Sequence, residues 1–104
     1  MKDSFLELVE ALKKNRQCPW SKELTVDKMK KEILSEAKEV ADEIDNKDYD
    51  ALKDELGDLI MDCIHTAILC EEKGYFEAKE VFEKPKEKLY RRKPWIFGDM
   101  KIKD

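Results

Sequence analysis

The chain has 104 residues, of which 41% are hydrophobic and 44% are charged, and its formal net charge is -4 at pH 7. This length predicts one domain over residues 1–104, and the apolar share suffices for a helical core, which excludes a globally disordered chain. The mildly acidic balance makes nonspecific binding to nucleic acid polymers or to anionic membranes unfavourable.

Apolar residues recur at helical spacing in four segments, and no segment shows the alternation of a β-strand. The first helix is expected over about residues 4–14, and a loop that contains Cys18-Pro19-Trp20 follows it. Thr25 is a suitable N-cap for a second helix that extends to about Asp45. The expected core positions of this second helix are Met29, Ile33, Ala37, Val40 and Ile44.

After a short turn, Asp48 can cap a third helix over about residues 49–73, and Gly74 then stands where a helix end favours positive φ. A fourth helix is expected over about residues 77–92, with either a kink or a break at Pro85. The expected core positions of the third helix are Leu52, Leu56, Leu59, Cys63, Ala67 and Cys70. The pattern predicts an all-α fold, a small antiparallel bundle of about four helices that is completed by homo-oligomerisation.

The tail over residues 91–98 shows no regular pattern. No apolar run approaches the about 18–20 residues that span a bilayer, so no membrane partner is expected. The amphipathic, acid-containing N-terminus does not resemble a signal peptide. The three cysteines form no CxxC pair and their number is odd. We therefore expect reduced thiols and a cytoplasmic location.

The second and third expected helices repeat one pattern nineteen residues apart. This shift aligns their core positions, and it also places Glu36 on Glu55 and Glu39 on Asp58. At about 100° per residue, each aligned pair of acids therefore has the same angle to the core stripe of its helix. A short turn makes the two helices antiparallel neighbours, so these four acids can converge.

Four converging carboxylates cannot all stay ionised without a compensating cation. Acids three residues apart on a helix have Cβ atoms about 5–6 Å apart, so each pair can share one ion. Hard oxygen ligands of this kind select Mg²⁺ or Mn²⁺. The predicted metal ligands are Glu36, Glu39, Glu55 and Asp58.

A solvated helix face is the alternative, because the chain has 25 acidic residues and most acids lie in solvent. Two acidic pairs in matched phase beside the core favour the metal site. Asp62 adds support, since it stands in the apolar run 59–64 and a partly buried acid needs a partner. Glu32 is expected to be solvated.

These acids, Glu36-x-x-Glu39 and Glu55-Leu56-Gly57-Asp58, resemble the ExxE…ExxD signature of MazG-type nucleoside triphosphate pyrophosphohydrolases. Cys18-Pro19-Trp20 is similar to the CPW element that precedes the second helix in that family. Residues 87–98, EKLYRRKPWIFG, are similar to its EKL-x-RR-x-P-x-x-FG ending. The three motifs occur in the family's order and cover residues 15–98.

The resemblance implies an all-α homodimer or homotetramer that hydrolyses nucleoside triphosphates to the monophosphate and pyrophosphate with Mg²⁺. It implies that the four acids act catalytically through the metal that they bind. It also implies that Lys88 and Arg92, one helical turn apart, face the phosphates, with Arg91 nearby. The chain departs from the family at Ser35, which replaces the first acid of EExxE, and Asp62 occupies a position where many members are neutral.

Trp20 is a candidate surface for stacking of the substrate base, and Trp95 is a second one. The alternative for both is a core or dimer contact, which is common for an aromatic side chain beside proline. The phosphates are expected to be held through metal and basic side chains, because the chain has no GxxxxGK[ST] loop.

Two other functions are compatible with parts of the sequence. A di-iron carboxylate bundle would need two ExxH pairs, whereas the only histidine, His65, forms one imperfect match with Asp62. His65 is otherwise expected to be a helix-surface or core residue. A non-catalytic helical interaction module would explain the amphipathic helices, but not the matched acids, the CPW loop and the basic tail together.

Overall fold

The computed structural model describes residues 3–97, and these residues form helices and no strand. The helices are α1 (Ser4–Asn15), α2 (Pro19–Lys22), α3 (Val26–Asn46), α4 (Tyr49–Glu72), α5 (Ala78–Arg92) and α6 (Pro94–Phe97). The predicted all-α class is confirmed, and the four long helices are the four that the sequence predicts. Gly98, the last residue of the predicted C-terminal motif, lies outside the described residues.

The predicted helix ends are confirmed by their hydrogen bonds. The Thr25 hydroxyl accepts from the backbone N–H of Lys28 at 3.2 Å, and the Asp48 carboxylate accepts from that of Ala51 at 3.1 Å. Gly74 has a φ of 75° after α4. The backbone of Lys47 also adopts the left-handed conformation, with a φ of 57°. This residue ends α3 and lets the chain reverse direction before α4.

Two short helices lie where the sequence predicts a loop and an irregular tail. Both α2 and α6 begin with a proline, whose fixed φ suits the first turn of a helix. Four residues are too few to produce a periodic apolar pattern, so the sequence does not reveal them. Pro85 lies inside α5, which continues as one helix through it. Pro85 is exposed, so water can satisfy the carbonyl that loses its partner.

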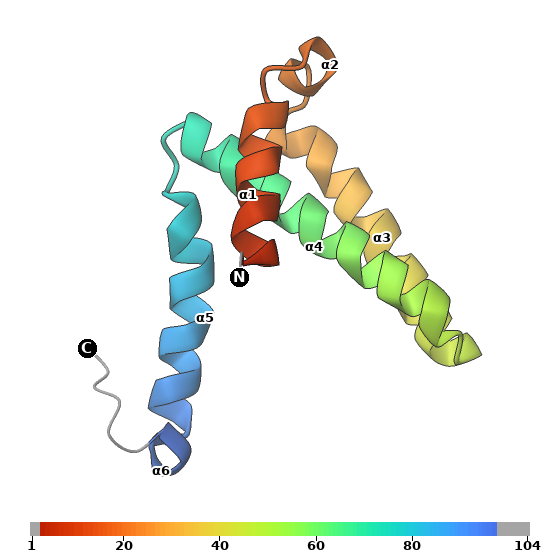
Figure 1. The fold of residues 1–104 in the computed structure, drawn as a ribbon, viewed down its shortest axis with the longest axis vertical. Helices are drawn as coiled ribbons and strands as arrows, with labels where there is room; N and C mark the ends of the chain where they lie inside the picture. The colour runs from red at the N-terminus through yellow and green to blue at the C-terminus, as the bar shows by residue number, and fades with distance from the viewer. Residues whose placement is uncertain (1–2, 98–104) are drawn as a thin grey trace.

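The long helices pack at two places along α4. Its first half lies side by side with α3 in an antiparallel hairpin, and α1 crosses its second half, where α5 also begins (Figure 1). The buried core lies at this second place, where Leu12, Ile64 and Ile68 pack together. The rings of Phe5 and Phe82 close its edge with centroids 4.9 Å apart. Helix α5 then runs away from the hairpin (Figure 1).

The predicted core stripe of the hairpin is only partly buried in one chain. Met29, Ala67 and Cys70 are buried as expected, but Cys63 is exposed and Leu56 is 42% exposed. The expectation that these two are core residues of a single chain is therefore wrong. Leu56 lies in the part of α4 that runs beside α3, away from the core of Leu12, Ile64 and Ile68, whereas Cys63 lies in the second half of α4 on a face of the helix that stays exposed. The buried residues of α4 instead include Ile64, His65, Ile68 and Leu69, which lie in its second half.

Ala37 and Ile44 of α3 are likewise exposed, Ile44 to 54%. The radius of gyration is 16.3 Å, where a compact chain of this length has about 13 Å. The single chain is thus open along its hairpin. Within residues 3–97, no helix combines the length and the apolar character that crossing a membrane requires.

Candidate active site

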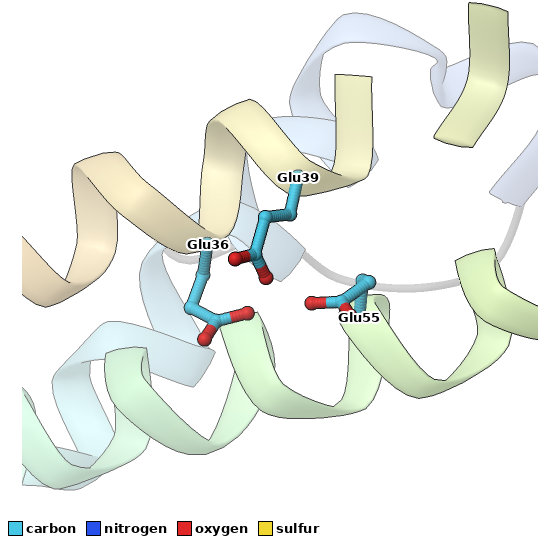
Figure 2. A group of neighbouring side chains, drawn as sticks. All are labelled: Glu36, Glu39 and Glu55. Atoms are coloured by element: carbon cyan, nitrogen blue, oxygen red, sulfur yellow. The ribbon is translucent and has the colours of Figure 1, made fainter. Parts of the chain in front are cut away.

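Three of the four predicted metal ligands lie together between α3 and α4. Glu36 and Glu39 project from α3 and Glu55 projects from α4, and their carboxylates point toward one another (Figure 2). One oxygen from each lies within 4.8 Å of the others. The antiparallel hairpin produces this convergence, because it places the acidic shoulder of one helix opposite that of the other.

Asp58, the fourth predicted ligand, is exposed and stands outside this group of three. It lies one turn beyond Glu55 on α4, and its charge helps to raise the pKa of Glu36. Its role as a metal ligand stays a prediction. Asp62, one turn further, is half-buried, and burial raises its pKa together with the charges of Glu32 and Asp58.

The pKa values of two of these carboxylates, Glu55 and Glu36, are raised in the metal-free protein. Hydrogen bonds with Glu39 and Glu36 raise the pKa of Glu55 to about 8, and desolvation and repulsion by the same two groups act in the same direction. For Glu36, the hydrogen bond with Glu55 lowers the pKa, but desolvation and the neighbouring acids outweigh it and leave the pKa raised. A proton therefore substitutes for part of the missing positive charge.

The site has the donors that a hard cation needs. One oxygen of Glu36 and one of Glu55 are buried and have no hydrogen-bond donor beside them. Among residues 3–97, no lysine or arginine forms an ion pair with these three acids. Around octahedral Mg²⁺, adjacent ligand oxygens are about 3 Å apart and opposite ones about 4 Å, so carboxylate oxygens within 4.8 Å of one another can share one ion once their side chains draw closer. The residues present fit Mg²⁺ or Mn²⁺.

His65 lies in the core, which is one of the two positions, helix surface or core, that the sequence left open. It is only 8% exposed, and its Nε2 has no hydrogen-bond partner among the described residues. Burial lowers its pKa, and the nearby Arg16 guanidinium lowers it further. A neutral, buried imidazole in this position contributes to packing at the second half of α4.

The predicted phosphate-binding residues are far from the acids within one chain. Lys88, Arg91 and Arg92 are exposed in the last turns of α5. This helix packs on α4 through its first half, at Ala78 and Phe82, and its other end lies away from the α3–α4 hairpin (Figure 1). The fold therefore does not bring these cations to Glu36, Glu39 and Glu55 of the same chain.

Trp20 is 81% exposed in α2, so it is not a core residue. An open groove of about 520 Å³, whose lining begins four residues after Trp20 in the sequence, at Leu24, follows the first turns of α3 to Glu32, one turn before Glu36. Its lining includes Leu24, Lys28 and Lys31. Sequence reasoning missed these two lysines, because a Lys-rich stretch at the start of a helix resembles an ordinary solvated face.

The sequence comparisons identify the family. Residues 24–97 match the family model described as the MazG nucleotide pyrophosphohydrolase domain. This chain belongs to the MazG family. The match spans the acids, the groove and the basic end of α5, so the resemblance inferred from the three motifs is confirmed.

Individual MazG relatives agree with this assignment. The chain is 35% identical over 98 residues to a nucleoside triphosphate pyrophosphohydrolase of Escherichia coli (strain K12), and this match covers 93% of the chain and 37% of the relative. It is 32% identical over 97 residues to the nucleoside triphosphate pyrophosphohydrolase/pyrophosphatase MazG of Thermotoga maritima, with 93% and 38% covered. An uncharacterised protein of Bacillus subtilis, YabN, is 33% identical over 101 residues, with 97% and 21% covered.

The chain thus spans between about a fifth and two fifths of the length of these curated relatives. A solved structure is closer in size. The crystal structure of a mazG-related protein from Thermotoga maritima superimposes with a TM-score of 0.78 at 30% identity, and the match covers 93% of this chain and 86% of that one. The helical arrangement described above is therefore also found in a MazG-related protein.

The raised pKa of Glu55 predicts a pH-dependent stability in the metal-free protein. The folded state keeps this proton up to about pH 8, whereas the unfolded chain releases it near 4.5. Between these values the folded state binds more protons, so the free energy of unfolding falls as the pH rises. We expect the Tm in chelator to fall between about pH 5 and pH 8, and Glu55→Gln to flatten this fall.

Thermal melts followed by circular dichroism measure both effects. Glu10→Gln, at an exposed position of α1, is the control and should keep the fall of the parent. A parent Tm that is constant or rises over this range would contradict the raised pKa of Glu55.

Proposed function

We propose that this chain hydrolyses nucleoside triphosphates to the nucleoside monophosphate and pyrophosphate, with Mg²⁺ or Mn²⁺ bound by Glu36, Glu39, Glu55 and Asp58. The observation that carries the proposal is the convergence of three carboxylates, with unpartnered buried oxygens, in a chain of the MazG family. The printed names of two relatives, which are nucleoside triphosphate pyrophosphohydrolases, support the same reaction.

The acids of the hairpin hold the metal and thereby hold the triphosphate, which a bare acidic cluster would repel. When bound, the ion neutralises charge on the phosphate oxygens and lowers the pKa of a bound water. Water attacks the α-phosphorus, the bond from this phosphorus to the α–β bridging oxygen breaks, and pyrophosphate leaves with the electron pair. Basic side chains stabilise the charge that develops on the leaving group.

Lys88, Arg91 and Arg92 supply these basic groups, and they come from a second copy of the chain. Within one chain the end of α5 lies away from the acids (Figure 1). A partner in a homodimer or homotetramer can place its own α5 end beside the hairpin of the first copy. One chain thus contributes the acids of a site and another contributes its cations.

The exposed surface of the single chain supports this association. It measures 8412 Å², where a compact monomer of 12.3 kDa exposes about 6100 Å². The excess is larger than the about 800 Å² that each partner buries in a standard interface. Apolar side chains of the hairpin contribute to it, namely Leu34, Ile44, Leu56, Ile60 and Met61.

The nucleoside is proposed to lie against Trp20 and in the groove beyond it. Trp20 presents an open aromatic face, and the groove volume of about 520 Å³ is within the range of small-molecule sites. Glu32, at the inner end of the groove, is one turn from Glu36. A nucleotide that extends along α3 can therefore place its base near Trp20 and its phosphates near the acids.

We place this reaction in the cytoplasm. All three cysteines are free, and Cys63 is exposed. Exposed thiols persist where the compartment is reducing.

Isotope labelling tests the reaction. In water enriched in ¹⁸O, with Mg²⁺ and a panel of canonical and modified triphosphates, the label should enter the monophosphate and not the pyrophosphate. Chelator should abolish turnover. Release of orthophosphate, or label in the pyrophosphate, would place the attack at another phosphorus and overturn the proposal.

The acids should be needed for turnover and not for folding. Glu55→Gln removes a proposed metal ligand, so we expect no turnover. It also removes the free-energy cost of keeping Glu55 protonated in the folded state, so we expect an unchanged or higher Tm without metal. Saturating Mg²⁺ should stabilise the parent by about 2.7 kcal/mol at a hundred times its Kd, and should do little for the variant. Calorimetry measures both, with Asp54→Asn, at the exposed neighbouring position, as the control that keeps the metal response. If Glu55→Gln unfolds and Mg²⁺ does not change the Tm of the parent, the acids have a structural role and the proposed metal site is wrong.

Subunit mixing tests whether one site uses two chains. Glu55→Gln and the Lys88→Ala/Arg92→Ala double variant should each be inactive alone. When they are coexpressed, half of the dimers are mixed and each mixed dimer has one intact site, so activity should return to about a quarter of the parent value. Mixing Glu55→Gln with Glu39→Gln is the control and should restore nothing, because both changes affect the acids of a hairpin. No recovery in the first mixture would mean that the cations act within their own chain, and light scattering that shows only a 12.3 kDa species would exclude a partner.

A further inference from the structure

Two consecutive glutamates at the end of α4 fasten the two parts of the chain that carry the proposed substrate-binding residues. The Glu71 carboxylate accepts a hydrogen bond from the backbone N–H of Ala78, at the start of α5, at 3.0 Å. The Glu72 carboxylate binds Arg16, at the start of the segment that carries Trp20. The same helix carries Glu55 of the metal site toward its other end.

Arg16 uses its whole guanidinium group in this contact. Its Nε and Nη2 donate to the two oxygens of Glu72 at 2.8 and 2.9 Å, in a bidentate pair. Its Nη1 donates to the hydroxyl of Ser21 at 2.9 Å and also to the Ser21 carbonyl. The Arg16 side chain is 14% exposed and Ser21 is 5% exposed, so the contacts between them are largely shielded from water, whereas the Glu72 carboxylate, with its side chain 44% exposed, faces solvent.

A lysine could not replace Arg16 here. Only the planar guanidinium presents parallel donors to one carboxylate and further donors to a second group. The hydrogen bond from Arg16 lowers the pKa of Glu72, so the pair is fully ionised at neutral pH. Bidentate charged pairs of this kind fix geometry as well as contributing energy.

The segment that Arg16 fastens has few other attachments. Helix α2 has four residues and no side-chain cap, and Trp20 itself is 81% exposed. At the far end of the segment, Lys28 donates to the Glu23 carbonyl at 2.9 Å. Near Trp20, the polar contact to α4 is the one through Arg16 and the adjoining Ser21.

We infer that Arg16 is a positioning residue: with Glu72 it clamps the Ser21 backbone to the end of α4, and so holds Trp20 where the nucleoside binds. The inference rests on the proposed function, because it takes a nucleotide as the ligand. Arg16 does not contact the metal site. Its loss should therefore weaken binding of the nucleoside and leave the metal and the chemical step intact.

Steady-state kinetics separate these effects. Loss of a charged hydrogen-bonding group that positions a binding residue should raise KM for the nucleoside triphosphate about tenfold in Arg16→Gln. We expect kcat to stay within about twofold and Mn²⁺ affinity, measured by calorimetry, to be unchanged. Arg16→Lys should behave like Arg16→Gln, since lysine cannot form the bidentate pair. An unchanged KM, or a loss of Mn²⁺ affinity, would overturn the inference.

A double-variant cycle distinguishes positioning from a general structural role. If Arg16 acts through Trp20, Arg16→Gln should add little to the KM of Trp20→Ala, whereas independent roles would multiply the two effects. Lys13→Gln is the matched control: it breaks the Lys13–Glu71 ion pair at the same end of α4 without touching the Trp20 segment, and KM should not change. Multiplicative effects would overturn the inference, and so would a control that raises KM as Arg16→Gln does.

Two further measurements keep the test decisive. If Arg16→Gln does not fold, Glu72→Gln removes the charge of the partner and should give the same KM increase.

If the parent releases no pyrophosphate, the proposed function fails, and the contact between Arg16 and Glu72 is then tested by fluorescence. In a Trp95→Phe background, Trp20 is the only tryptophan, and its anisotropy should decay faster when Arg16 is replaced by Gln. An unchanged decay would overturn the clamp independently of any activity.

Discussion

The repulsion among Glu36, Glu39 and Glu55 is the constraint on which the rest of this structure depends. Three carboxylates within 4.8 Å of one another destabilise the contact between α3 and α4, and the raised pKa of Glu55, which favours its protonated form, offsets only part of this. The helices nevertheless stay together, because the left-handed Lys47 reverses the chain and Met29 packs in the hairpin. A cluster of this kind between two packed helices is the arrangement that supports the proposed cation site.

Helix α4 separates the unfavourable cluster from the groups that stabilise the fold. Its first half carries the acids and has one neighbour, α3, whereas its second half is apolar and packs against α1 and α5. Its last turn then anchors α5 through Glu71 and the Trp20 segment through Glu72. Since an α-helix is stiff, this arrangement sets the distance from the acids to the Trp20 segment and to the start of α5 without direct contacts between them.

The exposure of apolar side chains along the α3–α4 hairpin also results from the acidic cluster. Two helices that face each other with carboxylates cannot use that face for a full apolar core, so part of the predicted stripe remains exposed, at Leu56 and Ile44. This exposed apolar surface is the feature on which the proposed association with a second chain depends. The proposed association of two chains and the proposed binding of a cation would thus both result from the acids on the facing sides of α3 and α4.

The sequence by itself determined the long helices, their caps at Thr25 and Asp48, the reversal before Asp48 and the phase of the acids, because all of these depend on neighbours within a few residues. It also carried the family motifs. The exposure of Cys63 and the burial of His65 follow from tertiary packing, because burial depends on which face of α4 the other helices cover, and residues two apart lie on different faces. The separation of Lys88 from the acids follows from the direction in which α5 leaves α4 (Figure 1). The contact between Arg16 and Glu72, 56 residues apart, follows from the way α1 packs on α4. No local sequence pattern encodes either orientation.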